Sequence, residues 1–413
     1  MNILLIAYAF PPREFSEAIV NGKLALALLS KGHQLTIISK NYEGPYYNKI
    51  WSAPWEKLKD KTIIIKYNSG NKIIRLIDTL LQSLKLGAIL PGIRWAGRAY
   101  SKAITLHTMT PFQLILTRSP VEVAHIVGYN INKKTKIKWM ANWNDPINGI
   151  WPSPYEKYNS HFHFLYYHLI FKKILDAADV NSFPSTSLME HFIWKFNIKT
   201  NNTTLIPHIQ LPDIKFPENN VRRERFRLCH AGNLSEERNP EFLFQALVKI
   251  KKDFPNLSFE LIILGIMNED VKTLILRYHL EETVIHKQPL NYLDALEYMN
   301  NCDLLVLIEA NLKHGIFLPS KISDYAQVNV PILALSPASG EVEKLISNYG
   351  GGIRVENLNT ESIYKALNLI FKIFASGNSL SSIYSTERLK EYHSERRILD
   401  IYNKQFNELL NNK

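Results

Sequence analysis

The chain has 413 residues, of which 46% are hydrophobic and 21% charged, a globular composition that excludes a disordered or a fibrous protein. Two domains are expected at this length, because a single hydrophobic core rarely grows beyond about 250–300 residues. The formal net charge of +11 is unevenly placed, since residues 1–200 hold 25 Lys or Arg against 12 Asp or Glu. This asymmetry indicates an anionic partner for the first half, a nucleic acid or a membrane surface. The alternative is ordinary solvated lysine.

The first half alternates strand and helix signals. Apolar runs bounded by turn residues predict strands at residues 2–10, 34–39, 61–67, 112–117 and 136–142. Between the first two runs, apolar residues recur at helical spacing from Val20 to Leu28, and Gly32 ends the helix. Such alternation predicts a parallel sheet covered by helices on both faces. The first run follows no basic leader, so we expect a strand there and not a secretory signal.

Residues 72–90 are long and apolar enough to resemble a membrane span. Four charged residues interrupt the run and argue against a span: Lys72, Arg75, Asp78 and Lys85. Basic residues beside a broad apolar face are typical of an amphipathic helix that lies on an anionic leaflet. The alternative is a helix whose apolar face packs on the sheet of its own domain.

The second half repeats the strand and helix pattern. Residues 197–220 are rich in Asn, Thr and Pro and predict a last strand followed by a linker. Further strands are expected at 226–232, 259–265, 283–288, 304–309, 331–336 and 351–356. The two cysteines, Cys229 and Cys302, lie among apolar residues at strand edges, which favours buried free thiols in a reducing compartment.

The pattern as a whole predicts an α/β fold of two doubly wound, Rossmann-like domains that face a cleft. The expected boundaries are an N-terminal domain over 1–205, a linker over 206–225, a C-terminal domain over 226–381 and a helical segment over 382–413 that crosses back.

One candidate anion site follows the strand at 226–232. Gly232 lets a ligand approach the backbone, and Arg238 precedes a helix start at Asn239 and Pro240. Because the free N–H groups of a helix start favour an anion, a phosphate group is the expected guest. The alternative is a surface arginine beside an ordinary helix cap.

A second candidate site lies in residues 314–335, which predict a loop, a helix and a strand. Gly315 and Pro319 shape a loop whose backbone amides are expected at the carboxyl edge of the sheet, where open α/β sheets bind ligands. Lys321 opposes the dipole of its helix, a penalty that a bound phosphate would offset. Asp324, one turn on, is suited to accept two hydrogen bonds from sugar hydroxyls. The alternative is that Asp324 faces solvent.

These stretches together resemble a family 4 (group 1) glycosyltransferase of the GT-B fold, of the type that builds bacterial surface polysaccharides. Residues 7–39 resemble the family's opening strand, acceptor loop and first helix. HAGNLSEERNPEFLFQAL (230–247) is similar to its diphosphate segment, and residues 314–335 to its Glu-x7-Glu segment in a Pro-Ser-Lys form. Residues 115–131 and 139–147 resemble the middle strands of a subgroup with an Arg-Asp-Pro segment.

The resemblance implies three groups of site residues. The nucleotide-sugar site would comprise Gly232, Asn233, Arg238, Pro319, Ser320, Lys321 and Asp324. The acceptor side would comprise Phe15, Ser16 and Glu17. The catalytic groups would be Arg238, Lys321 and Asp145.

The chain departs from the family pattern at several of these places. Asn233 stands where the family has Arg, so Lys321 would supply the missing diphosphate cation. Ile316 stands where the first acid of Glu-x7-Glu belongs, and Asn144 replaces the Arg of Arg-Asp-Pro. The acceptor loop lacks the usual Gly-Gly pair and carries residues 13–16 in its place.

The resemblance implies transfer of a sugar from a nucleotide-diphosphate donor to an acceptor hydroxyl, on a lipid-linked or surface-polysaccharide glycan. No metal or other cofactor is expected, in keeping with a sequence that lacks Asp-x-Asp. Retaining transfer is implied, in which a donor phosphate oxygen takes the acceptor proton. Inverting transfer would need a protein base, and either Asp145 or Glu17 would serve.

The expected location is the cytoplasm, peripheral on the inner face of the cell membrane, with the donor, the acceptor glycan and an anionic membrane as partners. No nucleic acid is expected, because a basic recognition helix is missing. Two alternatives remain open. One is a nucleotide-sugar 2-epimerase on the same fold, and the other is a non-catalytic partner of an active transferase.

Overall fold

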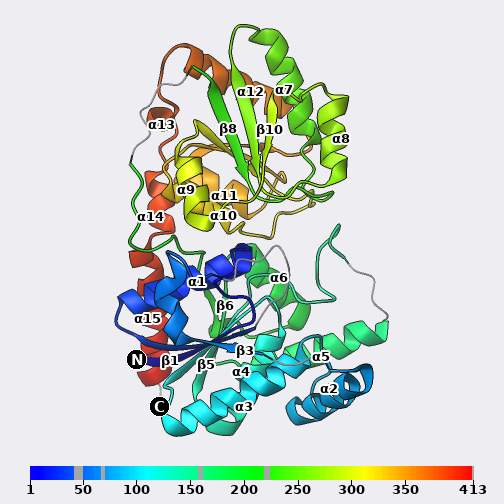
Figure 1. Ribbon diagram of the computed structural model, residues 1–413, viewed down its shortest axis with the longest axis vertical. Helices are drawn as coiled ribbons and strands as arrows, with labels where there is room; N and C mark the ends of the chain where they lie inside the picture. Colours follow the sequence, from blue (N-terminus) through cyan, green and yellow to red (C-terminus); the bar gives the residue numbers. More distant parts are fainter. Residues whose placement is uncertain (41–49, 67–69, 157–160, 218–223, 412–413) are drawn as a thin grey trace. The chain divides into compact units, whose positions relative to one another are not determined.

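The computed structural model describes residues 1–40, 50–66, 70–156, 161–217 and 224–411. The chain forms two compact units (Figure 1). Unit 1 comprises Met1–Trp151, Glu156–Pro212 and Ile398–Lys413, and unit 2 comprises Pro152–Tyr155 and Asp213–Arg397. Residues 218–223 of the expected linker and Tyr67 of the third expected strand lie outside the described residues.

In the described part of unit 1, a seven-stranded parallel sheet has the order β3-β2-β1-β4-β5-β6-β7. Its strands are β1 (Asn2–Ala7), β2 (Gln34–Lys40), β3 (Thr62–Ile65), β4 (Leu114–Arg118), β5 (Lys138–Asn142), β6 (Val180–Phe183) and β7 (Thr203–Leu205). The order reverses between β1 and β4, which pair directly from Ile3↔Leu114 to Ala7↔Arg118. The carboxyl ends of these two strands therefore form a topological switch point.

The helices of unit 1 are α1 (Ser16–Ser30), α2 (Lys72–Leu86), α3 (Ile93–Met109), α4 (Val123–Thr135), α5 (His161–Ala177), α6 (Thr186–Phe196) and α15 (Glu395–Asn411), with short 3-10 turns at Trp55–Lys61 and Thr200–Asn202. Helix α1 covers one face of the sheet and α3 and α4 cover the other (Figure 1). The long last helix α15 joins unit 1, where the Tyr402 hydroxyl accepts a hydrogen bond of 3.1 Å from Arg118 Nη1.

In the described part of unit 2, a six-stranded parallel sheet has the order β10-β9-β8-β11-β12-β13. Its strands are β8 (Phe226–Ala231), β9 (Phe259–Leu264), β10 (Val284–Lys287), β11 (Leu304–Ile308), β12 (Ile332–Ser336) and β13 (Gly352–Glu356). Its helices are α7 (Glu241–Asp253), α8 (Glu269–Arg277), α9 (Tyr292–Asn300), α10 (Lys321–Gln327), α11 (Glu341–Tyr349), α12 (Thr360–Ala375), α13 (Leu380–Ile383) and α14 (Glu387–Tyr392). The switch point lies between β8 and β11.

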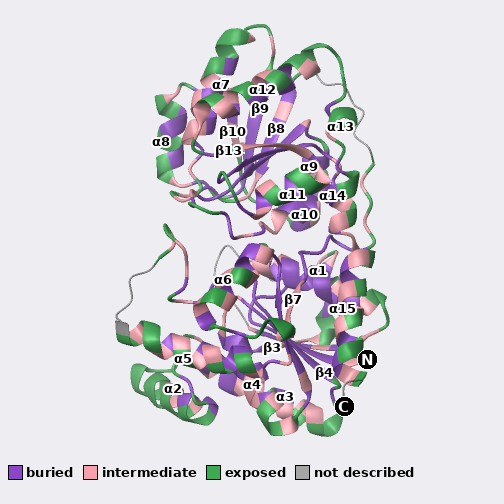
Figure 2. Ribbon diagram, turned by 180° about the vertical axis from the view of Figure 1, so that it is seen from behind, coloured by how far each residue is buried: buried purple, intermediate pink, exposed green. Residues whose placement is uncertain are grey.

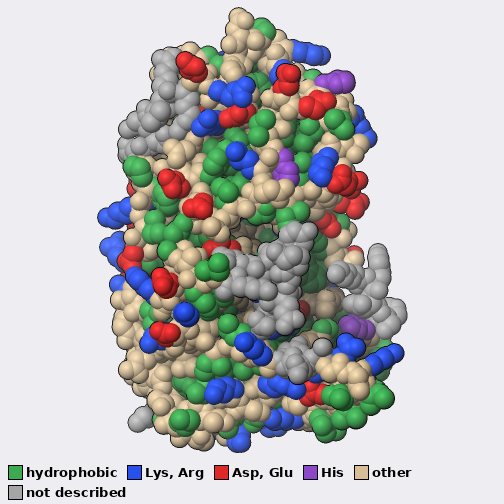
Figure 3. All heavy atoms as spheres, in the orientation of Figure 1, with side chains coloured by type: hydrophobic (Ala, Val, Ile, Leu, Met, Phe, Trp, Pro, Cys, Tyr) green, Lys and Arg blue, Asp and Glu red, His purple; other side chains and the backbone are tan. Residues whose placement is uncertain are grey.

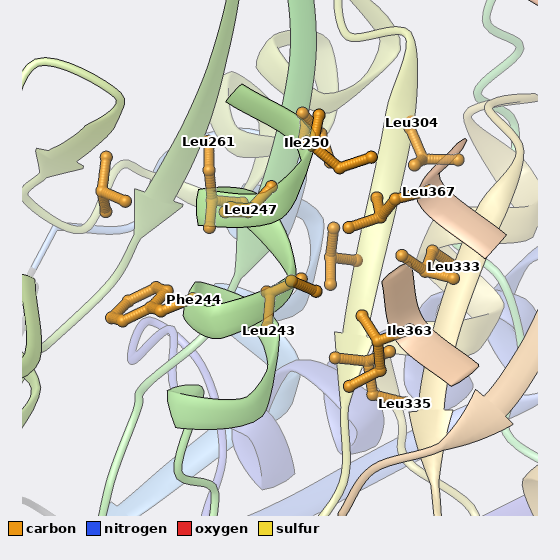
Figure 4. Packing of buried hydrophobic residues seen from close by; sticks show 14 of the residues in the cluster. Leu243, Phe244, Leu247, Ile250, Leu261, Leu304, Leu333, Leu335, Ile363 and Leu367 are labelled. Carbon is orange, nitrogen blue, oxygen red and sulfur yellow. The ribbon is translucent and has the colours of Figure 1, made fainter. Parts of the chain in front are cut away.

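The sheets and the helix faces that cover them are buried in both units (Figure 2). In unit 2, Leu243 and Leu247 of α7 pack with Ile363 and Leu367 of α12 over the strands, and all four side chains are at most 1% exposed (Figure 4). Two parallel sheets, each with helices on both faces, confirm the predicted α/β class with two Rossmann-like folds. Cys229 and Cys302 are free and buried, as expected.

Residues 72–90 do not form a membrane span. Helix α2 ends at Leu86, where Gly87 adopts a left-handed conformation with φ of 69°. Among the described residues, no helix combines the length and the apolar character that crossing a bilayer requires.

Truncation of Leu247 to alanine should lower the free energy of unfolding by about 2–5 kcal/mol, because Leu247 is completely buried between α7, α12 and the sheet. The matched control is Leu276→Ala on α8, where the side chain is 60% exposed and a loss below about 0.5 kcal/mol is expected. Urea unfolding of both variants tests the packing shown in Figure 4, and equal losses would contradict it.

Candidate functional site

The candidate site of unit 2 lies at the switch point between β8 and β11. Gly232 follows β8 directly, and Glu309 follows β11 directly. Because β8 and β11 are neighbours in the sheet, both residues lie at the same carboxyl edge. In open α/β sheets, this crevice is the usual place of a ligand.

Lys321 extends to the backbone of Gly232. A Cβ atom at residue 232 would collide with Lys321 Nζ, so the missing side chain of Gly232 leaves the space that the ammonium group uses. Pro319 and Ser320 direct the lysine there. The Pro319 carbonyl accepts a hydrogen bond of 3.0 Å from Ile322 N–H, and Ser320 is the N-cap of α10.

The cations predicted from the sequence come together at this edge. Burial, together with the nearby Arg238, lowers the pKa of Lys321 to about 7, whereas Asp324 acts in the opposite direction. Arg238 and Asp324 therefore both lie within electrostatic range of Lys321. An anion beside Lys321 and Arg238 would relieve their mutual repulsion.

His230 also lies beside Gly232, close to Lys321. Its Nδ1 lies 2.9 Å from the Val306 carbonyl, which assigns the proton to Nδ1. Burial and the nearby Lys321 lower the pKa of His230 well below its usual value, so the ring is neutral. Its Nε2 is buried and has no hydrogen-bond partner in the described part of the chain, and it can therefore accept a hydrogen bond from a ligand.

Asp324 does not face solvent, in contrast to the alternative interpretation of the sequence. It is 8% exposed, and its Oδ1 accepts a hydrogen bond of 2.6 Å from the Tyr292 hydroxyl. Tyr292 thus fixes the orientation of the carboxylate.

Other predicted residues of this site have structural roles. Asn233 Oδ1 accepts a hydrogen bond of 2.9 Å from Ile266 N–H and holds the loop after β8. The Gly315 amide donates to the Ser339 carbonyl at 2.9 Å, so the expectation that this amide faces a ligand is wrong. The α7 cap is Pro240 and not Asn239, although Asn239 Oδ1 accepts from Glu241 N–H at 2.9 Å.

A second candidate site lies at the carboxyl edge of the unit 1 sheet. Glu17, in the first turn of α1, accepts a hydrogen bond of 3.0 Å from Asn144 Nδ2. Burial, together with the nearby Asp145, raises the pKa of Glu17 to about 8. The predicted residues Glu17 and Asp145 are thus brought together. Phe15 is the N-cap of α1 without a side-chain cap bond, and Ser16 is exposed.

Arg118 is a member of this second site that the sequence did not reveal. It is 5% exposed and donates from Nε to Asn21 Oδ1 at 2.7 Å. Its charge partly opposes the rise in the Glu17 pKa. The sequence feature that could have indicated Arg118 as a site residue is its position at the end of a predicted strand, next to Ser119 and Pro120. His230 and Glu309 likewise end strands, and their neighbours in the sheet could not be predicted.

Within the described ranges, no group of three or more His, Cys, Asp or Glu side chains could hold a metal ion.

A family model described as glycosyl transferases group 1 matches residues 213–377, which lie within unit 2. No curated protein matches the chain.

Solved structures share the fold over the whole chain. A sucrose-phosphate synthase from Thermosynechococcus elongatus has a TM-score of 0.72 at 16% identity, over 100% of both chains. A glycosyltransferase from Rickettsia africae ESF-5 has a TM-score of 0.66 at 15% identity, over 100% of this chain and 99% of the other. A putative UDP-N-acetylglucosamine 2-epimerase from Listeria monocytogenes has a TM-score of 0.53 at 13% identity, over 98% of this chain and 96% of the other.

Identities this low show the fold alone, which is the GT-B fold of two Rossmann-like sheets with a long C-terminal helix. The match of the family model adds chemistry for one unit. The chain therefore has the GT-B fold, and its residues 213–377 match the model of the group 1 glycosyl transferases.

Proposed function

We propose that the protein is a metal-independent glycosyltransferase that moves a sugar from a nucleotide-diphosphate sugar to an acceptor hydroxyl. The observation that carries the proposal is the cluster of Arg238 and Lys321 beside Gly232 at the switch point of unit 2. The leaving group of such a transfer is a nucleoside diphosphate. Its developing negative charge requires cations that are already in place.

The donor-site residues divide this work among them. Gly232 leaves the space in which the Lys321 ammonium group lies, and Arg238 and Lys321 neutralise the charge of the diphosphate. Asp324, held by Tyr292, accepts hydrogen bonds from the ribose hydroxyls. Pro319 and Ser320 place Lys321, and Asn233 holds the loop after β8.

Unit 1 would bind the acceptor through Phe15, Ser16 and Glu17. We propose retaining transfer, in which an oxygen of the donor phosphate takes the acceptor proton. The raised pKa of Glu17 supports this choice, because a carboxyl group with a pKa of about 8 is protonated at neutral pH and does not act as a base there. Asp145 stays the candidate base for inverting transfer.

A nucleotide-sugar 2-epimerase is the second candidate, favoured by the shared fold of the Listeria monocytogenes protein. It would use the same diphosphate site but would act on a soluble substrate, which leaves the surface of α2 unexplained. A non-catalytic partner of an active transferase would not need the cation cluster.

The acceptor that we propose is a lipid-linked or surface-polysaccharide glycan, reached from an anionic membrane on the cytoplasmic side of the cell membrane. Helix α2 carries the argument. Seven of its apolar side chains are 53–73% exposed: Ile73, Ile74, Leu76, Ile77, Leu80, Leu81 and Leu84. The alternative that this face packs on the unit's own sheet is therefore wrong.

Helix α2 docks on unit 1 through its polar side. Asp78 forms ion pairs with Arg94 at 2.5 Å and with Arg98 at 2.9 Å, both on α3. Lys85 donates to Ser101, also on α3. Because charged groups hold the helix to the protein, its apolar face is left to the outside.

Helix α5 extends the same surface. Four of its apolar side chains are 41–80% exposed: Phe162, Phe164, Leu165 and Leu169. Ile89, just after α2, donates its N–H to the Tyr166 hydroxyl of α5. Figure 3 shows hydrophobic side chains with Lys and Arg beside them at the lower right, where Figure 1 places α2. Apolar side chains with adjacent cations suit an anionic leaflet.

Nucleoside diphosphates should raise the melting temperature of the protein. A panel of UDP, GDP and dTDP at pH 7 should contain at least one that does so, and Arg238→Ala and Asp324→Ala should abolish the shift. The control is Arg277→Ala, an exposed arginine on α8. Affinity should fall by up to about tenfold per pH unit between pH 7 and pH 9, because Lys321 loses its proton above a pKa of about 7. The proposal fails if none of the three nucleotides binds.

The product of the transfer should keep the anomeric configuration of the donor sugar. Proton NMR of the glycoside product measures this configuration directly, because the new glycosidic bond fixes the anomeric centre and prevents mutarotation. An inverted product would contradict retention and would assign the role of base to Asp145.

The protein should float with vesicles that contain phosphatidylglycerol, and about 0.5 M salt should weaken the binding. The double variant Leu80→Glu/Leu84→Glu should lose flotation, because it places two carboxylates on the exposed apolar face. Leu276→Glu, at a 60% exposed leucine of unit 2, is the matched control and should float like the unmodified chain. Equal flotation with pure phosphatidylcholine vesicles would reject the anionic membrane as a partner.

A further inference from the structure

Glu309 is a buried acid at the switch point of unit 2 that the donor site described above does not use. It is 4% exposed, although carboxylates are seldom buried unless they are paired. Its backbone is fixed on two sides. The N–H donates to the Leu335 carbonyl at 2.9 Å, and the carbonyl accepts from Asn357 Nδ2 at 3.3 Å. The starting point of the side chain is therefore well defined.

One carboxyl oxygen of Glu309 has no hydrogen-bond partner among the residues that the structure describes. This oxygen, Oε2, is buried. A Cβ atom at Gly315 would lie 3.5 Å from this oxygen, so the loop after β11 passes close to the carboxyl group without contributing a polar side chain there. A buried acceptor without a donor lowers the stability of the folded protein.

The charges around Glu309 connect it to the donor site. Burial raises its pKa to about 8, and Arg238 is the largest opposing influence, followed by Arg354. Arg238 also acts on Lys321 and His230. The carboxyl group thus lies on the same cation cluster for which we propose the diphosphate.

The chemistry of the group narrows what it can bind. A phosphate beside Glu309 would be repelled by the carboxylate, and an apolar ligand would leave Oε2 without a donor. A hydroxyl group is both donor and acceptor, so it can pair with the carboxylate or with the protonated acid. In a nucleotide-sugar donor, the hydroxyl groups nearest to the diphosphate belong to the ribose and to the transferred sugar. Asp324 already serves the ribose in the proposed site.

We propose that Glu309 binds a hydroxyl group of the transferred sugar and thereby contributes to the choice of donor. The inference rests on the proposed glycosyltransferase function. It assigns to Glu309 a contact with the sugar and not with the nucleotide, and this distinction can be measured.

The experiment compares each nucleoside diphosphate with its sugar conjugate. Dissociation constants are measured calorimetrically for UDP and UDP-glucose, GDP and GDP-mannose, and dTDP and dTDP-glucose. The proteins are the unmodified chain, Glu309→Ala, Glu309→Gln and the control Glu341→Ala, which removes a neighbouring acid in the first turn of α11. Glu309→Ala should weaken at least one conjugate by about 10-fold to 100-fold and leave its free diphosphate within about twofold. Glu309→Gln, which keeps hydrogen-bonding groups at this place, should restore part of the loss, and Glu341→Ala should change neither.

Melting temperatures separate this role from a purely structural one. Glu309→Gln removes a buried acid and should melt no lower than the unmodified chain at pH 8 and above, where that acid is most costly to keep ionised. The inference is overturned if Glu309→Ala weakens every diphosphate as much as its conjugate, or if it weakens none of the conjugates. The failure of all three free diphosphates to bind the unmodified chain would instead overturn the proposed function itself.

Discussion

The proposed donor site depends on one contact, that of the Lys321 ammonium group with the space that Gly232 leaves open. Burial and the neighbouring Arg238 both disfavour the charge on this lysine. Without an anion, its position therefore does not stabilise the folded protein. The benefit appears only when an anion enters. Since the backbone around Pro319 and Ser320 fixes the start of α10, the cation is in place before a ligand arrives, which is the arrangement that stabilises a developing charge best.

Much of the fold follows from the alternation of apolar runs and helical periods, and the strand positions agree within a few residues. Strand β6 was not predicted, because two of its four residues, Asn181 and Ser182, are polar. Both are fully buried, and Asn181 accepts from Trp143 Nε1 at 2.9 Å and donates to the Leu175 carbonyl at 2.9 Å. The sequence cannot show that a polar residue will find its partners in a neighbouring segment.

The residues of the candidate site in unit 2 also show how far the sequence alone can predict which side chains meet. Gly232, Arg238, Lys321 and Asp324 could be predicted because loop, helix and strand signals frame them. Glu309 could not, because an acid at the end of an apolar strand normally marks the place where a chain reaches solvent. Its burial results from the sheet order, which brings β11 beside β8 and β12. Residue types and spacing therefore predict the edge of a sheet that binds a ligand, whereas the pairing of strands decides which side chains meet there.

The two units use the same architecture for ligands of different charge. In unit 2 the edge at the switch point gathers Arg238 and Lys321, which suit a diphosphate. In unit 1 the corresponding edge gathers Glu17 and Asp145, and Arg118 is engaged with Asn21 and Tyr402. Glu17 is protonated at neutral pH because its pKa is about 8, and carboxyl groups at this edge suit a neutral ligand rich in hydroxyls, which they can bind through hydrogen bonds. This difference supports the proposal that unit 2 binds the donor nucleotide and unit 1 the acceptor hydroxyl.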